Sequence, residues 1–226
     1  ITPWTFSFTS SPRRGGVATA DDTGLTTMRS FASTEPGPRM KDEMLSLLLA
    51  AATSIHEAAD EKQLAERIMD AAVRGTGLQN AIVLRPIDTG GRVEVVASRL
   101  SPNAQGGISF SRLLLAAAEN GNVAEISGDG GDISQSMVAM KIKAALCVPI
   151  MLGPTAAQFL YLDSRGGLPA AIRANGSAFC VALGRMASLA LSNLKRVDFE
   201  RRQAVFDSDL RAAAAAQLGN GALDGD

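Results

Sequence analysis

The residue types best suited to nucleophilic or metal chemistry are a single histidine, His56, and two cysteines, Cys147 and Cys180. A Cys-His or Ser-His-Asp arrangement needs a nucleophile beside a base that a third group orients. His56 lies beside an apolar stripe with no evident partner of this kind. Both cysteines stand in apolar segments, where a thiol packs as a small hydrophobic group. Zinc needs three or four clustered ligands. The sequence therefore predicts no catalytic residue, no metal site and no disulfide framework.

The glycine-rich segment from Ser127 to Asp132 has the residue types of a phosphate-binding or calcium-binding loop. It lacks the Lys and Ser/Thr of a P-loop, and it lacks the ligand spacing and closing Glu of an EF-hand. A surface turn is the better interpretation. The chain also has no G-x-S-x-G nucleophile elbow and no G-x-G-x-x-G dinucleotide fingerprint. Hydrolase and oxidoreductase functions therefore lose their main support.

The charge balance is close to neutral, because 22 Lys and Arg stand against 23 Asp and Glu in 226 residues. Nucleic-acid binding depends on a concentrated Lys/Arg surface, and no such stripe is visible. A content of 46% hydrophobic and 20% charged residues is too apolar for a wholly disordered chain. The apolar run from Met44 to Ile55 is too short for a membrane span of about 20 residues. We expect a folded, cytoplasmic protein with no cofactor and no nucleic-acid or membrane partner.

Two amphipathic helices of about four turns each are expected near the start of the folded region. In the first, from Met40 to Ala59, apolar side chains recur at helical spacing. Asp60 and Gln63 resemble a capping box that begins the second helix. Gly75 or Gly77 ends it.

Strands and further helices follow this pair. A hairpin of strands 79–84 and 93–98 is joined across residues with hairpin-turn chemistry. Ser109 is expected to cap a helix that ends at Asn120 and Gly121. The remaining expected elements are a strand at 123–126, a short helix at 134–143, strands at 145–151 and 158–163, and a helix at 175–217.

Both ends differ from the folded region, residues 40–195. Residues 1–8 alternate like the last strand of an upstream domain, residues 9–39 have the composition of a flexible linker, and residues 219–226 are expected to be disordered. The C-terminal helical pattern continues over residues 196–218. About forty helical residues reach about 60 Å, roughly twice the span of a small domain core. Part of this helix must therefore find a partner outside its own domain.

Three segments resemble the closing part of a GAF domain, a small-molecule sensing and dimerisation module of signalling proteins. They are Ala145–Ile150, with Pro149 in a Val-Pro-Ile step, Gln158–Arg165, with Asp163 in a Leu-Asp-Ser turn, and the helix Phe179–Asn193. The resemblance covers residues 41–195. It implies an α/β fold (an α+β sandwich) with a central antiparallel sheet of five or six strands and with the N- and C-terminal helices packed on one face.

The flanks carry a second, shorter resemblance. Ile1–Phe8 is similar to the last strand of a forkhead-associated domain, and Asp209–Gln217 is similar to the helix that leads into a serine phosphatase or a class III nucleotide cyclase. The function implied is a regulatory sensor and dimerisation domain of a bacterial multidomain signalling protein, which controls a downstream phosphatase or cyclase through its terminal helices. A ligand-free dimerisation scaffold is the alternative. A free-standing enzyme would need catalytic groups that the sequence does not supply.

The resemblance places a small-molecule pocket between the sheet and the crossover from Val123 to Lys143. Cyclic nucleotides are disfavoured because the Asn-Lys-x-Phe-Asp-Glu series of that subfamily is absent, and bilins because no Cys or His stands where the chromophore is held. The Met and Ile side chains of this region have an alternative role as core. The candidate lining residues are Ile126, Ile133, Ser134, Ser136, Met137 and Met140, with Lys143 as an anion partner.

The apolar stripes of the first and last helices are suited to pack into a four-helix interface across a two-fold axis. The alternative is that the domain's own sheet covers both stripes, which explains poorly the apolar residues beyond the domain boundary. A parallel homodimer is therefore expected. The candidate interface residues are Leu45, Leu48, Ala52, Ile55, Met186, Ala190, Leu194 and Val197.

Overall fold

The computed structural model describes residues 27–32, 42–88, 92–102, 104, 107–127, 142–165 and 171–221. Its strands are β1 (Thr27–Ala32), β2 (Asn80–Pro86), β3 (Val93–Arg99), β4 (Asn122–Ser127), β5 (Ala144–Leu152) and β6 (Thr155–Asp163). Its helices are α1 (Asp42–His56), α2 (Glu61–Thr76), α3 (Arg112–Ala118) and α5 (Gly176–Gly221). The predicted strand at 1–8 and nearly all of the predicted helix at 134–143 lie outside the described residues.

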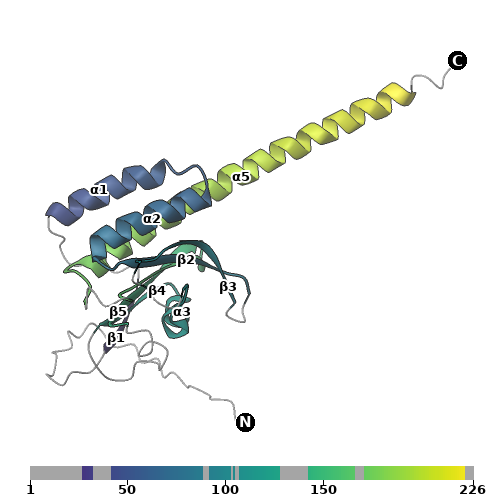
Figure 1. The fold of residues 1–226 in the computed structure, drawn as a ribbon. Coiled ribbons are helices and arrows are strands. Elements are labelled where there is room, and N and C mark those ends of the chain that lie inside the picture. The colour runs from purple at the N-terminus through teal and green to yellow at the C-terminus, as the bar shows by residue number, and fades with distance from the viewer. Residues whose placement is uncertain are drawn as a thin grey trace, which may run out of the picture.

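The six strands form one antiparallel sheet in the order β1-β4-β5-β6-β2-β3 (Figure 1). β2 and β3 pair as a hairpin, and so do β5 and β6, which Gly153 joins in the left-handed conformation at φ 65°. The sequence predicted both hairpins and, through the family resemblance, an antiparallel sheet of five or six strands. This confirms the predicted fold class.

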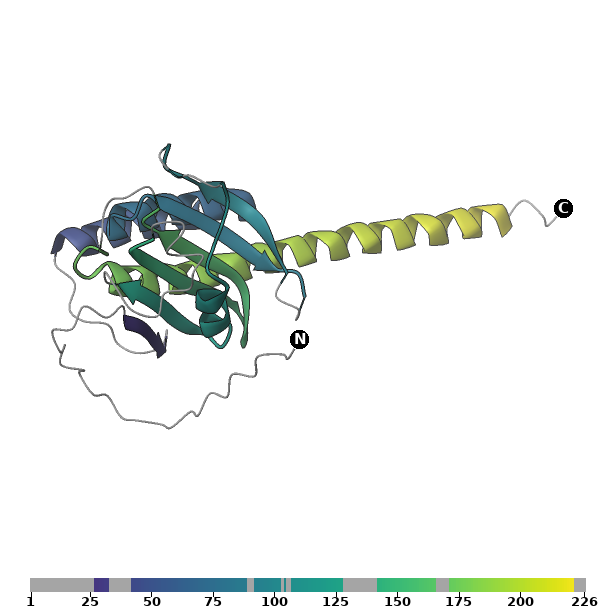
Figure 2. The same cartoon turned by 60° about the horizontal axis from the view of Figure 1, so that its bottom comes forward.

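Helices cover the two faces of the sheet unequally (Figures 1 and 2). Leu160 and Leu162 of β6 point to one face, where they share a core with α1, α2 and α5. Phe159 and Tyr161 of the same strand point to the other face, where they pack with α3. This alternation follows from the period of two along a strand. The expected packing of the N- and C-terminal helices on one face is confirmed.

The ends of α2 follow the predicted capping chemistry. The Asp60 side chain accepts a hydrogen bond of 2.8 Å from the Gln63 amide, and the Gln63 side chain accepts one of 3.3 Å from the Ala59 amide. Gly77 ends the helix in the left-handed conformation at φ 77°. For α3 the prediction was wrong by two residues, because Ser111 rather than Ser109 is the N-cap.

β1 lies inside the segment 9–39, which was predicted to be a flexible linker. It pairs antiparallel with β4, in a register that runs from Thr27 opposite Ser127 to Ala32 opposite Asn122. The linker prediction is therefore wrong for residues 27–32. The open edge of β4 supplies backbone hydrogen bonds to any extended segment, so that a strand forms there without a strong apolar pattern.

α5 is a single helix of 46 residues, about 70 Å long, that runs from the core into the open (Figures 1 and 2). Its first part packs against α1, α2 and β5. Leu183, Ala187 and Leu191 lie on the buried side of this part, as members of the core that the helices share with the sheet. Met186, Ala190 and Leu194 of the stripe predicted from the sequence lie beside this core row and are half-buried.

The second part of α5 has left the core. From Arg196 to Ala212 every side chain is exposed except that of Asp198, which is half-buried. The helix extends through Gly221, so the first three residues of the predicted disordered tail are helical, and residues 222–226 lie outside the described part of the chain.

Among the described residues, α5 is also the one helix that is long and apolar enough to cross a membrane. However, 39% of its apolar stretch is buried inside the fold. One such helix is weak evidence for a membrane span, because the core helix of a soluble protein passes the same test of length and composition.

Candidate functional site

The predicted small-molecule pocket is described only at its two ends. Ile126 is 3% exposed and packs in the core beneath α3, so its side chain has the alternative role that the sequence left open. Lys143 is exposed, and its backbone amide donates a hydrogen bond of 3.0 Å to the Ser164 hydroxyl. The other five candidates lie outside the described residues, and their role stays a prediction: Ile133, Ser134, Ser136, Met137 and Met140.

A buried polar cluster joins the ends of β2 and β6. The Asp163 carboxylate accepts hydrogen bonds from the Arg165 Nε at 2.8 Å, the Arg165 amide at 3.0 Å and the Asn80 Nδ2 at 3.0 Å. The side chains of Asp163 and Arg165 are 0% and 1% exposed. The Arg165 Nη1 also donates to the Gly107 carbonyl at 2.9 Å, which ties the sheet to the segment before α3. The resemblance pointed to Asp163, but it did not identify Arg165 or Asn80.

Two further groups on this side of the sheet could carry covalent chemistry only if they were ionised. Burial, and then the charge of Asp163, raise the pKa of Tyr161, so its hydroxyl stays protonated at neutral pH. Burial likewise raises the pKa of the Cys147 thiol on the same face of the sheet. A buried neutral thiol is a poor nucleophile. Neither Tyr161 nor Cys147 is therefore activated for covalent chemistry.

The predicted dimer-interface residues fall into three groups. Leu45 and Val197 are 47% and 54% exposed, as an interface requires. Ile55 is 3% exposed and belongs to the core of its own chain, so the prediction is wrong for its side chain. The remaining candidates are all half-buried: Leu48, Ala52, Met186, Ala190 and Leu194.

Sequence reasoning missed other exposed apolar residues on the same helices. Leu49 of α1 is 64% exposed, and Leu189 and Phe199 of α5 are 66% and 67% exposed. Phe199 stands seven residues before Phe206, and Leu210 follows four residues later. This heptad spacing was the signal that could have identified Phe199.

A shallow groove lies where the end of α1 meets α5. Its volume is about 210 Å³, and His56 of α1 lines it together with Asn193 and Val197 of α5. The only histidine of the chain therefore lies next to the predicted interface. This agrees with the flanking position that the sequence predicted for it.

Glu61, at the start of α2, connects the sheet to α5. Its carboxylate forms ion pairs with Arg85 of β2 and Lys195 of α5, and it accepts a hydrogen bond of 3.0 Å from the Gln158 Nε2 of β6. Burial raises the pKa of Glu61, but hydrogen bonds and charge from Lys195 and Arg85 outweigh burial and hold the pKa below its ordinary value. The point at which α5 leaves the sheet is thus fixed by an ionised carboxylate.

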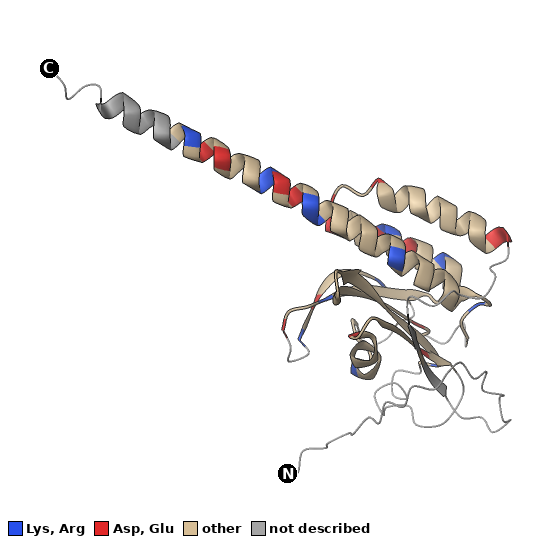
Figure 3. Cartoon of the chain, turned by 180° about the vertical axis from the view of Figure 1, so that it is seen from behind, with Lys and Arg blue, Asp and Glu red and all other residues tan. Residues whose placement is uncertain are grey.

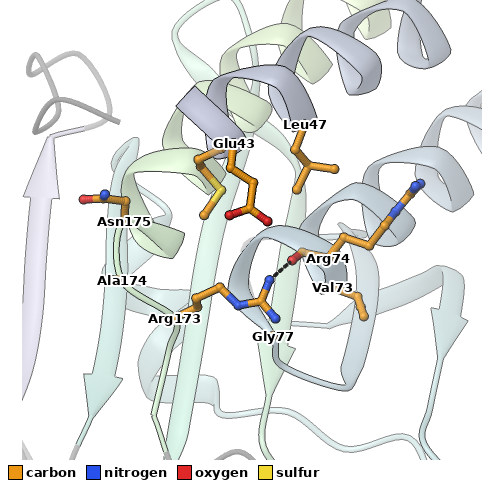
Figure 4. Close-up of a pocket in the computed structure, with 9 residues that line it drawn as sticks. Glu43, Leu47, Val73, Arg74, Gly77, Arg173, Ala174 and Asn175 are labelled. Carbon is orange, nitrogen blue, oxygen red and sulfur yellow. Dashed lines mark hydrogen bonds between the residues drawn. The ribbon is translucent and has the colours of Figure 1, made fainter. Parts of the chain in front are cut away.

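A larger cavity lies at the opposite end of the helical layer (Figure 4). Its volume is about 850 Å³, within the usual range for small-molecule sites. The start of α1, the end of α2 and the segment before α5 form its walls. Figure 4 shows the Glu43 carboxylate and the Arg173 guanidinium directed into this space. Within the described part of the chain, no three His, Cys, Asp or Glu residues are grouped so as to hold a metal ion.

No family model matches the sequence, and no curated protein matches it significantly. Solved structures do resemble the fold. The GAF domain of a protein described as a putative sensor histidine kinase from Pseudomonas syringae superposes with a TM-score of 0.51 at 12% identity, over 71% of this chain and 93% of that one. The GAF domain of Acinetobacter phosphoenolpyruvate-protein phosphotransferase superposes with a TM-score of 0.53 at 14% identity, over 70% of this chain and 99% of that one.

The chromophore-binding domain of a Stigmatella aurantiaca bacteriophytochrome gives a TM-score of 0.52 at 15% identity. The alignment covers 67% of this chain and 60% of that domain, so the chain spans less than two thirds of its length. At these identities the likeness concerns the fold alone. The chain has the GAF fold, which agrees with the resemblance found in its sequence.

Proposed function

We propose that this chain is a regulatory sensor domain of a multidomain signalling protein, which forms a parallel homodimer through α1 and α5. In this proposal a change in the packing of the helical layer passes along α5 to a downstream module. The observation that carries the proposal is the exposed apolar surface of α5 beyond the sheet. Phe199, Phe206 and Leu210, which lie within about 40° of one another around the helix, are each between 53% and 67% exposed there.

Such a surface favours a partner, because contiguous exposed apolar groups mark interaction sites. Four charged residues of the same stretch form ion pairs within the helix. Figure 3 shows charged residues of both signs along the exposed part of α5. Arg196 pairs with Glu200, and Arg202 pairs with Asp198, each four residues apart. These pairs support the exposed helix and leave its apolar seam open.

A second copy of the chain is the partner that the spacing favours. Phe199, Gln203, Phe206 and Leu210 follow the alternation of four and three residues that lines a coiled-coil seam. In a parallel pair with two-fold symmetry each seam residue meets its own copy. Leu45 and Leu49 on the exposed side of α1 would extend this interface over the domain.

The GAF fold supports a sensory role, since it is shared with the domain of a chain described as a putative sensor histidine kinase. The direction in which α5 extends supports an output through that helix. A serine phosphatase or a nucleotide cyclase is the downstream module that we propose, on the resemblance of Asp209–Gln217, and the cytoplasm is the proposed location. The ligand-free scaffold is the alternative, and a ligand-binding test distinguishes the two.

The dimer is tested by light scattering coupled to size-exclusion chromatography at tens of micromolar protein. We expect a dimer for the wild type and a monomer for the double variant Phe199→Glu, Phe206→Glu, because four carboxylates would meet in one apolar seam. Ser208→Glu, about 200° around the helix from Phe206, is the matched control and should remain a dimer. A monomeric wild type would overturn the proposal.

The parallel arrangement is tested by oxidative cross-linking of Gln203→Cys. Both native thiols are buried and should not react. A parallel seam brings the two introduced thiols together, so a covalent dimer is expected, whereas Ser208→Cys should cross-link poorly. Equal cross-linking of both variants would contradict a parallel seam.

A further inference from the structure

Arg173 is a fixed cation in the cavity that the start of α1, the end of α2 and the segment before α5 form. Arg173 donates from its Nη1 to the Arg74 carbonyl at 2.8 Å and from its backbone amide to the Thr76 carbonyl at 2.8 Å. These bonds cap the end of α2 and hold the guanidinium beside Gly77. The remaining N–H groups of Arg173 have no carboxylate partner among the described residues.

The cavity also has one anion, on a different element. Glu43 lies in the first turn of α1, where an acidic side chain interacts favourably with the helix dipole. Its carboxylate faces Arg173 across the cavity in Figure 4, yet the two do not form an ion pair. The cavity therefore presents a positive and a negative group that are separate from one another.

Arg74 and Asn175 also line the cavity, and Figure 4 shows both side chains directed away from the space between Glu43 and Arg173. Met44 and Leu47 of α1 and Val73 of α2 line the space between the two charged groups. Met44 is 9% exposed, so it forms part of the floor and is not a mobile surface group. A ligand that matches these walls has an anionic group, a cationic group and an apolar portion.

We propose that this cavity binds an α-amino acid with an apolar side chain, whose carboxylate contacts Arg173 and whose ammonium group contacts Glu43. The ligand's side chain would pack on Met44, Leu47 and Val73. This inference rests on the sensory role proposed above and names the ligand class for it. A ligand in this position contacts α1 and α2 as well as the segment that begins α5, and it would thus bias the packing of all three helices.

Isothermal titration calorimetry of the full chain tests the proposal with three probes. L-leucine carries both charges, 4-methylpentanoate lacks the ammonium group, and 3-methylbutylamine lacks the carboxylate. Leucine should bind, and each of the two analogues should bind at least about tenfold more weakly, since each loses one charge-assisted contact. L-methionine and L-phenylalanine test the tolerance of the apolar wall.

Two variants assign the contacts. Glu43→Gln should weaken leucine binding at least about tenfold and leave 4-methylpentanoate binding unchanged. Arg173→Gln should also weaken leucine binding at least about tenfold, but it should leave 3-methylbutylamine binding unchanged. Glu66→Gln and Arg112→Gln, at exposed positions outside the cavity, are the matched controls. If the loss of the Arg173 hydrogen bonds at the end of α2 unfolds Arg173→Gln, the effect of Glu43→Gln on leucine binding still tests the proposal.

The outcomes separate this inference from the proposed function. No binding of any of the three amino acids, or binding that Glu43→Gln leaves unchanged, would overturn the inference. The cavity lies within one chain, so calorimetry can detect leucine binding to a monomer as well as to a dimer. Leucine binding to a monomeric wild type would support the proposed ligand class and reject the dimer. A dimer that binds no amino acid would keep the proposed assembly and reject the ligand class.

Discussion

At the scale of single residues, Glu61 determines how the sheet and α5 are joined, and its charge is the relevant property. Its folded pKa is lowered from the ordinary value of 4.5, so folding favours the ionised form. The stabilisation is fully present above pH 4.5 and is lost as the pH falls through the lowered folded pKa. The Glu61 carboxylate should therefore stabilise the domain at neutral pH and contribute nothing at a pH well below its lowered pKa.

Glu61→Gln tests this dependence in urea unfolding. At pH 7 the variant should be less stable by about 1 kcal/mol, the scale of a partly exposed ion pair, and the difference should disappear in acid. Glu66→Gln, which lies on the same helix and is exposed, should change little at either pH. A difference between wild type and Glu61→Gln that is independent of pH would contradict the role of the charge.

Asp163 is the residue whose loss should destabilise the domain most. Asp163→Ala would leave the buried Arg165 guanidinium without its counter-charge, which costs about 3 to 5 kcal/mol. The matched control is Asp70→Ala, which removes an ion pair with Arg99 whose side chains are 51% and 52% exposed and should cost less than about 1 kcal/mol. Equal losses in the two variants, measured by urea unfolding, would show that the cluster is not critical.

These residue-scale features differ in how far the sequence reveals them. The Leu-Asp-Ser turn pointed to Asp163 through the family resemblance. Arg165 could not be recognised as buried, because arginine is almost never fully buried unless it is paired. Glu61 could not be recognised either, because its partners Arg85 and Lys195 are far away in the sequence and meet it only in the folded chain.

At the scale of elements, the close approach of α5 to β5 depends on Gly184. A Cβ atom at this position would lie 2.6 Å from the Val148 Cγ1, well inside van der Waals contact. Gly184→Ala should therefore destabilise the domain by about 1 to 3 kcal/mol through overpacking, despite the better helix propensity of alanine. Thermal unfolding measures the loss.

The double variant Gly184→Ala, Val148→Ala is the control for that prediction. Removing the Val148 methyl groups relieves the clash, so the two substitutions together should cost less than the sum of their separate effects. Strictly additive losses would mean that the contact between α5 and β5 does not limit the packing.

The elements themselves were largely predictable, because a helical or alternating apolar pattern is local. α1, α2, both hairpins, β4 and α5 stand close to their expected positions. β1 was not predictable, since an edge strand depends on the backbone of β4 more than on its own side chains. The N-cap of α3 was misplaced because Ser109 and Ser111 are both suitable capping residues, and only the path of the chain decides between them.

At the scale of the whole molecule, the candidate site was the least predictable feature. The cavity is formed by the start of α1, the end of α2 and the segment before α5, and no pattern in the sequence indicates that these three ends meet. The long α5 was predictable, because about forty residues of helical pattern exceed the span of the domain. The sequence thus predicted the helix through which we propose that the signal passes, whereas the cavity that we propose to bind the ligand was found only in the structure.

The continuity of α5 has a consequence for any module that is joined to it. Each residue added to an α-helix turns the rest of the chain by about 100°, and seven added residues restore the original orientation to within about 20°. A module attached rigidly to α5 is therefore held at a fixed azimuth as well as a fixed distance. An insertion of one or two residues would turn the module about the helix axis relative to the domain. A whole heptad would move the module farther from the domain and keep its orientation nearly unchanged. The length of α5 between the domain and the module is therefore constrained to steps of seven residues, and selection can act on insertions and deletions that break this rule.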